Sequence, residues 1–320
     1  MAGPVSQIHT LRVKYNAAAD HAGTQLQDST GSNLSAGDEA LSPAAIAAGY
    51  SGVDSGTTGA PDTTANLEGK AGNTMSIEIL KETVTAKTRK LSARWTFESA
   101  QDAQSIHGID VEAEIMAALA QEITAEIDQE VIASLYSLAG SAESDVQYDQ
   151  SGVSGTATFV GDEHAALAVM INRAANKIAQ RTRRGAGNFA VVSPHTLTVL
   201  QSATTSAFAR TTEGSFEAPT NTKLVGTLNN AMKVYVNTYA SDATDVLVGY
   251  KGSSESDAAA FYCPYIPLMS SGVVLDPDTF EPVVSFMTRY GYVELNNTAS
   301  SLGNAADYLA RVSVANVSFS

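Results

Sequence analysis

The chain has 320 residues, and its 34 Asp and Glu residues against 19 Lys and Arg residues give a formal net charge of −15. This excess of acid argues against a free-standing nucleic-acid binder and disfavours membrane-surface binding, because both polyanionic partners need a basic footprint on the protein. With 44% hydrophobic and 17% charged residues, the chain is globular and long enough for two domains or one large one.

Residues 16–74 are too poor in large apolar side chains to build a core of their own. Of these 59 positions, 35 are Ala, Gly, Ser or Thr, and the stretch SGVDSGTTGAPDTT is typical of successive turns. Two interpretations stay open: a disordered linker, which the composition favours, or an extended arm that becomes ordered by lying on another surface.

The next segment, MSIEILKETVTAKTRKLSARWTF at 75–97, is rich in β-branched and aromatic residues and predicts one or two long strands. Five basic residues lie within fourteen positions of it, against the single acid Glu82. These five are Lys81, Lys87, Arg89, Lys90 and Arg94. The predicted strands are therefore basic in a chain that is strongly acidic overall.

The block from Glu98 to Ser141 has the opposite charge, with nine acids and no Lys or Arg, and its pattern is helical. Gly108 is typical of a residue that ends a short first helix, and Asp110 is typical of the N-cap of a second. The second helix is expected to run to about Leu138, a length of roughly 40 Å. Its apolar residues recur every four positions, so the apolar stripe advances by about 40° per repeat. A helix with such a spiralling stripe is expected to contact different partners along its length.

An α/β layer is predicted downstream of a Gly- and Ser-rich linker at 140–161. A helix is expected from Asp162, with three arginines near its C-terminal end and Gly185 to stop it. It is followed by a strand (FAVVS), a short helix that opens at Pro194, and two more strands (MKVYVNTY and DVLVGY). The last 60 residues carry mainly strand signals.

No combination of residues predicts an enzyme, a metal site or a cofactor site. The five histidines are isolated, and the chain lacks the phosphate-loop, dinucleotide-binding and nucleophile-elbow motifs. Asp276 and Asp278 are interpreted as part of a turn rather than of a calcium loop. Cys263 is expected to be a buried small hydrophobe, and as the one cysteine it excludes an internal disulfide.

Basic strands beside an acidic helix, with an arm that cannot pack on itself, predict a subunit that engages copies of itself. The candidate inter-subunit contacts are Lys87, Arg89, Lys90, Arg94, Glu122, Glu126 and Glu130. The alternative, in which the basic strand and the acidic helix pair within one chain, stays equally open.

One long stretch, TVTAKTRKLSARWTFESAQDAQSIHGIDVEAEIMAALAQEITAEIDQEVI, resembles the signature region of T-even-like bacteriophage major capsid proteins. Three further stretches, RRGAGNFAVVSP, FYCPYIPL and PVVSFMTRYGY, follow it in the order found in that family. The resemblance implies an α+β chain with the Hong Kong 97 phage capsid fold. It implies an N-terminal arm at 1–15, an extended two-stranded loop at 16–90, a peripheral domain at 91–159 and 271–320 with a spine helix at 109–138, and an axial α/β domain at 160–270.

The same resemblance implies a non-enzymatic major capsid protein that forms the hexamers and pentamers of a tailed-phage head around double-stranded DNA. The expected partners are copies of the chain itself, a portal, a scaffold and decoration proteins, with no sequence-specific DNA contact, no membrane and no cofactor. The chain is expected to be made and assembled in the host cytoplasm and to end in the virion capsid. Two alternatives stay open: a vertex paralogue that forms pentamers only, and an acidic α/β enzyme whose site lies in loops without a recognisable motif.

Overall fold

The computed structural model describes eleven main stretches of the chain and a few residues between them. The stretches are 1–15, 75–141, 146–149, 160–182, 184–202, 208–210, 222–229, 231–241, 245–254, 257–295 and 305–317. The segment 16–74, for which the sequence left arm and linker open, lies outside the described residues except for Thr64, Glu68 and the short strands β2 (Asp20–His21) and β3 (Thr24–Gln25).

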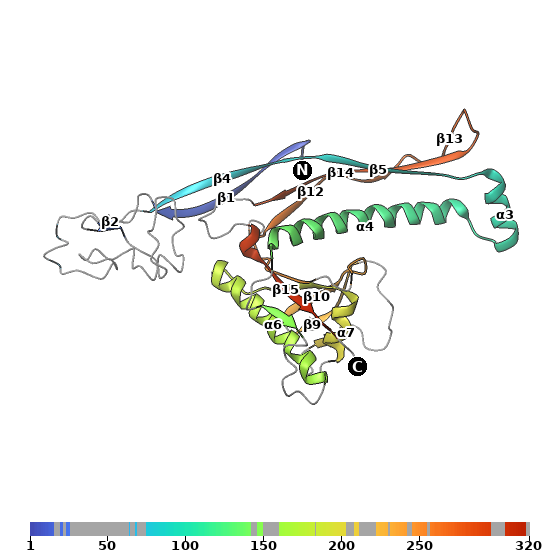
Figure 1. Ribbon diagram of the computed structural model, residues 1–320. Helices are drawn as coiled ribbons and strands as arrows, with labels where there is room; N and C mark the ends of the chain where they lie inside the picture. Colours follow the sequence, from blue (N-terminus) through green and yellow to red (C-terminus); the bar gives the residue numbers. More distant parts are fainter. Residues whose placement is uncertain are drawn as a thin grey trace.

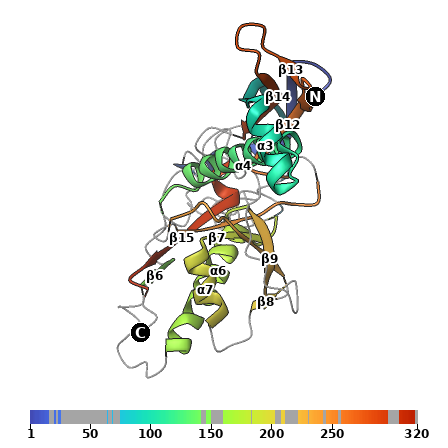
Figure 2. The same ribbon diagram turned by 90° about the vertical axis from the view of Figure 1, so that its right-hand side faces the viewer.

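The described chain forms two bodies and a projecting ribbon (Figure 1). The ribbon consists of β1 (Val5–Tyr15) and β4 (Met75–Thr85), which pair antiparallel along their whole length. The ribbon extends away from an elongated body that contains the long helix, here called the spine body. A second body, built on a seven-stranded sheet, lies to one side of that helix, as Figures 1 and 2 show.

The spine body is a four-stranded antiparallel sheet with helices at one face and one end. Its central strand β14 (Pro282–Glu294) pairs with β5 (Lys87–Arg94), β12 (Ala260–Ser270) and the short β13 (Val274–Leu275). The two helices are α3 (Phe97–His107) and α4 (Val111–Ala139).

The ends of α3 and α4 follow the capping chemistry that the sequence predicts. Gly108 ends α3 in the left-handed region, with φ of 66°, and its N–H donates to the carbonyl of Gln104. The carboxylate of Asp110 accepts from the N–H of Glu112 at 3.1 Å and so caps α4. Both predicted cap positions are confirmed.

The long helix α4 packs on both bodies. Its N-terminal half buries Leu119 and Ile123 against Val284 and Phe286 of β14. Its C-terminal end, through Leu135 and its neighbours, packs on the seven-stranded body, against a cluster that includes Tyr308 and Leu309. The predicted spiral of the apolar stripe is thus confirmed, because the stripe contacts one body and then the other.

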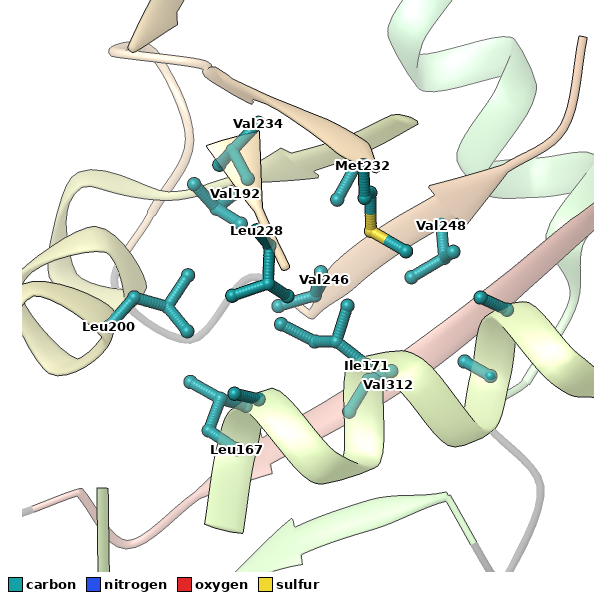
Figure 3. Packing of buried hydrophobic residues seen from close by; sticks show 14 of the residues in the cluster. Leu167, Ile171, Val192, Leu200, Leu228, Met232, Val234, Val246, Val248 and Val312 are labelled. Atoms are coloured by element: carbon teal, nitrogen blue, oxygen red, sulfur yellow. The ribbon is translucent and has the colours of Figure 1, made fainter. Parts of the chain in front are cut away.

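The seven-stranded sheet has the order β6-β15-β11-β7-β10-β9-β8. Its strands are β6 (Gln147–Asp149), β7 (Phe189–Val192), β8 (Phe208–Arg210), β9 (Lys223–Leu228), β10 (Met232–Val236), β11 (Val246–Gly249) and β15 (Leu309–Ala315). Two helices, α6 (Val160–Thr182) and α7 (Pro194–Ser202), contribute to its core, and the 3₁₀ turn η1 (Ala305–Tyr308) precedes β15. Figure 3 shows Leu167 and Ile171 of α6 meeting side chains of the sheet such as Val246, Leu228 and Val312.

Strand pairing divides the chain differently from the predicted domain ranges at four strands. β6 and β15, expected in the peripheral ranges 91–159 and 271–320, belong to the seven-stranded sheet, and β12, expected within 160–270, belongs to the four-stranded sheet. β1, expected as a separate arm at 1–15, is one strand of the ribbon. These pairings join segments far apart in the chain, and periodicity along the sequence does not reveal such partners.

Two smaller expectations have different outcomes. Cys263 is half-buried rather than buried, because β12 pairs with β14 along one edge and leaves its other edge without a neighbour in the described sheet. The turn at Asp276 and Asp278 is confirmed, since the N–H of Asp278 donates to the carboxylate of Asp276 at 3.1 Å. Among the described residues, no helix is both long and apolar enough to cross a membrane.

Candidate assembly surfaces

Large apolar side chains of the ribbon are exposed in the described structure. On β4, Met75 is 56% exposed, and Ile77 and Ile79 are each 67% exposed. The strand register places Val13 opposite Ile77 and Leu11 opposite Ile79. A two-stranded ribbon has little independent stability in water, so the uncovered residues indicate a surface that another surface covers.

A second apolar surface lies at the far end of the spine body, around α3 (Figure 1). No residue of α3 is buried, and Ile106 is 72% exposed. Phe97 of α3 contacts Phe280 of the β13–β14 turn with ring centroids 5.7 Å apart, and Phe280 is itself 69% exposed. An eleven-residue helix without a fully buried residue is marginal by itself, so this end of the body also indicates a contact surface.

Between these ends, the acidic helix and the basic strand are joined by one polar network. Arg89 of β5 forms ion pairs with Glu126 and Glu130, which lie one turn apart on α4. Its Nε donates to the hydroxyl of Tyr290 on β14 at 3.3 Å, and that hydroxyl donates to Glu130 Oε2 at 2.6 Å. The network therefore ties β5, β14 and α4 together.

The hydrogen bonds of the network shift the pKa values of Arg89 and Glu130 in the directions that favour their charged forms. The hydrogen bond from Tyr290 lowers the pKa of Glu130, with Arg89 acting in the same direction against the opposing effect of burial. Burial raises the pKa of Tyr290, and its hydrogen bond to Glu130 raises it further. Burial opposes the charge on Arg89, but its hydrogen bonds to Tyr290, Glu126 and Glu130 outweigh this effect and raise its pKa.

The seven predicted contact residues fall into two groups, three that pair with one another within the chain and four others that are exposed. Side chains alternate along β5, so that Arg89, Leu91 and Ala93 are half-buried while Lys90 and Arg94 are exposed. The intramolecular alternative therefore holds for Arg89 with Glu126 and Glu130.

The other predicted residues remain accessible. Lys87 is exposed at the rim of an open cavity of about 270 Å³, lined by Lys87, Thr88, Arg89, Glu130, Tyr290 and Tyr292. Arg94 lies 3.8 Å from Glu281, a loose pair. Glu122 is exposed on α4, and in the part of the chain that the structure describes neither it nor Lys87 or Lys90 forms an ion pair.

A further polar cluster at the junction of the two bodies was not predicted. Arg311 of β15 donates to Asp245 at 2.7 Å and to the carbonyl of Gly140, at the C-terminal end of α4, at 2.8 Å. The last turn of α4 has no basic residue, so Arg311 supplies the cation that favours a helix C-terminus. Its guanidinium also lies 5.7 Å from the centre of the Tyr136 ring. In the sequence, the one signal for this cluster was that the acidic helix ends without a basic residue of its own.

The groups of the Arg89 network hydrogen-bond to each other. Arg89 donates from each of its three nitrogens, and Tyr290 donates to Glu130. No group of three potential metal ligands occurs within the described stretches. The geometry therefore supports holding strands to a helix, with apolar surfaces left for contact.

Comparisons with known proteins agree with this description. Residues 1–314 match the model of the family described as "Major capsid protein Gp23". The chain is 35% identical over 258 residues to the major capsid protein of Vibrio phage KVP40, covering 74% of this chain and 50% of that protein. It is 34% identical over 250 residues to the major capsid protein of Enterobacteria phage T4, covering 73% and 47%. The chain thus spans about half the length of these two relatives. It is also 31% identical to the major capsid protein of Salmonella phage ViI, covering 91% of this chain and 70% of that one.

Solved structures share the fold at low sequence identity. A structure from Microbacterium phage Oxtober96 has a TM-score of 0.51 at 11% identity, covering 98% of this chain and 87% of the other. A structure from Mycobacterium phage Bobi has a TM-score of 0.51 at 13% identity, covering 99% and 87%. The mixed helix and sheet architecture is therefore one found in structures from other phages.

Proposed function

Because the chain belongs to the Gp23 major capsid protein family, we propose that its copies assemble into the protein shell of a bacteriophage head. The observation that carries this proposal is the pair of exposed apolar surfaces at opposite ends of the molecule, one on the ribbon strand β4 and one around α3. Surfaces at opposite ends of one molecule suit head-to-tail contacts between copies, and such contacts close into rings when the rotation between copies allows it. The rings of the proposed shell are hexamers and pentamers.

The proposed parts are those of the Hong Kong 97 phage capsid fold. The ribbon corresponds to the extended loop, the spine body to the peripheral domain with α4 as spine helix, and the seven-stranded body to the axial domain. The pairing of β1 with β4 supports including residues 5–15 in the extended loop, and the sheet order supports including β6 and β15 in the axial domain.

Charge supports a role for the outward side of β5 in contacts between copies. Lys90 and Arg94 are exposed and basic, whereas Glu122, an exposed acid of α4, has no cation within ion-pair distance among the described residues. Lys90 and Arg94 of one copy, together with Lys87, which is exposed at the start of the strand, are proposed to meet acids such as Glu122 of a neighbour. Each exposed pair contributes less than about 1 kcal/mol, but a shell repeats the contact many times.

The remaining parts of the proposal follow from the role of a shell subunit. The shell encloses double-stranded DNA without reading its sequence, and a net charge of −15 disfavours adhesion of the genome to the protein. A portal, a scaffold and decoration proteins are the proposed further partners. The chain is proposed to assemble in the host cytoplasm and to end as part of the virion capsid.

Electron microscopy of the purified protein tests the proposal. Shells or capsomer rings are the expected result, and rings that include hexamers distinguish a shell-forming subunit from a vertex subunit that forms pentamers only. Discrete small particles at every concentration and salt condition would contradict the proposal.

A further inference from the structure

The ribbon is anchored to the spine body by a buried valine. Val84 is 1% exposed, whereas Met75, Ile77 and Ile79 of the same strand are more than half exposed. Val84 lies against Gly291 of β14, a residue of the PVVSFMTRYGY stretch. The polar network around Arg89 does not include Gly291.

Glycine is required at 291 for space and not for backbone conformation. Gly291 is not among the described residues with positive φ, so other residues could adopt its backbone. A Cβ at this position would overlap Cγ1 of Val84, and it would lie 3.3 Å from the carbonyl oxygen of Thr85 and 3.4 Å from Sδ of Met1. Since carbon atoms pack at about 3.5–4.0 Å, a methyl group here would displace Val84 by about 1 Å or more.

This contact lies where the ribbon leaves the body. β5 pairs with β14 as far as Lys87 opposite Tyr290, and Gly291 is the next residue of β14. On the other side of Ala86 the chain pairs with β1 instead, and the N–H of Ala86 donates to the carbonyl of Pro4 at 2.8 Å. The chain therefore changes partners within a few residues of Val84, and the rest of the ribbon extends from this point (Figure 1).

We propose that Gly291 is a positioning residue for assembly, because Val84 seated on it sets the direction in which the ribbon leaves the spine body. This assignment rests on the proposed function, since the direction of the ribbon matters to assembly only if the ribbon reaches a neighbouring subunit. The chain changes strand partners at Ala86, which lies about 7 Å along the strand from Val84 and about 30 Å from Ile77. If the strand turns about Ala86, a displacement of about 1 Å at Val84 is therefore multiplied about fourfold at Ile77. The expected shift at Ile77 is about 4 Å.

The test measures the direction of the ribbon in unassembled subunits. Spin labels are placed at Ile77→Cys on the ribbon and Ala117→Cys on α4, both exposed positions, in a Cys263→Ser background, and the distance between them is measured by pulsed electron paramagnetic resonance. Gly291→Ala is expected to shift the distance by about 4 Å, and Val84→Ala combined with Gly291→Ala is expected to restore it. Gly3→Ala is the matched control, because its Cβ would meet only the carbonyl oxygen of Val5 at 3.8 Å.

Assembly is scored in parallel without spin labels. Gly291→Ala is expected to lose most of its shells, and the double variant to regain them. An unchanged distance in Gly291→Ala, or a shifted distance with parental shells, overturns the assignment. If Gly291→Ala does not fold, the single variant Val84→Ala tests the assignment instead. Loss of the Val84 side chain should broaden the distance distribution, and an unchanged distribution overturns the assignment. Absence of shells from the parental chain refutes the proposed function, and the distance measurement still reports on Gly291.

Discussion

Replacement of Arg89 by glutamine should destabilise the unassembled subunit at neutral pH. The side chain of Arg89 is 27% exposed, and those of Glu126 and Glu130 are 43% and 48% exposed, so each ion pair contributes about 0.5–1 kcal/mol. The substitution also leaves Glu126 and Glu130 one turn apart without a cation, which costs a few tenths of a kcal/mol more. The hydrogen bond from Tyr290 to Glu130 does not depend on Arg89 and remains. The free energy of unfolding should therefore fall by about 1–2 kcal/mol.

The pH dependence of this deficit follows from Glu130. Its pKa is lowered in the folded chain, so its stabilising contribution is complete above the ordinary glutamate value of 4.5 and is lost as the pH falls through the lower folded pKa. The difference between parent and Arg89→Gln should be full at neutral pH and should shrink in acid below 4.5.

Urea unfolding followed by circular dichroism measures both effects, with Arg94→Gln as the matched control. Arg94 is an arginine of the same strand, but its side chain is 60% exposed and lies 3.8 Å from Glu281, so its loss should cost less than about 0.5 kcal/mol. Equal losses in the two variants, or an Arg89→Gln deficit that stays constant in acid, would refute the reasoning.

Three other changes test contacts between copies, the charge of the helix and the junction of the bodies. Lys90→Glu combined with Arg94→Glu should lower the yield of shells seen by electron microscopy while the circular dichroism spectrum of the subunit stays parental, and parental yields would place the partners of β5 elsewhere. Glu122→Lys should raise the affinity of capsomers for duplex DNA in a salt-dependent way, measured by fluorescence anisotropy, and unchanged binding with failed assembly would make Glu122 a structural partner instead. Arg311→Gln should lower the free energy of unfolding by about 2 kcal/mol, because it leaves the largely buried carboxylate of Asp245 without its cation, and a loss below about 0.5 kcal/mol would contradict that role.

Local chemistry made the helices of the spine body predictable. Gly108 and Asp110 act within one turn of their own positions, so their roles as caps can be read from neighbouring residues. The four-residue repeat of α4 likewise predicted contact with more than one partner, which the packing of Leu119 in one body and Leu135 near the other confirms.

Contacts between distant segments could not be predicted in the same way. Tyr290 lies 201 residues from Arg89, and the spacing of Glu126 and Glu130 signals a shared partner without saying which one. The pairing of β1 with β4 spans the whole segment 16–74, and the composition of that segment says nothing about the strands on either side. The exposed residues Ile77 and Ile79 have strand periodicity, but periodicity does not show that their side of the ribbon is exposed in the described part of the chain.

The two interpretations of the charged residues, pairing within the chain and pairing between copies, are compatible because a strand has two sides. Arg89 is an odd-numbered residue of β5 and lies toward α4, whereas Lys90 and Arg94 are even-numbered and lie on the exposed side. One side of the strand therefore stabilises the fold through Glu126 and Glu130, and the other side stays available for the proposed neighbour. Counting bases and acids along the sequence treats all four basic residues from 87 to 94 alike. The two-residue period of the strand separates Arg89 from Lys90 and Arg94, so a charge reversal at Arg89 perturbs folding first, whereas one at Lys90 and Arg94 perturbs assembly first.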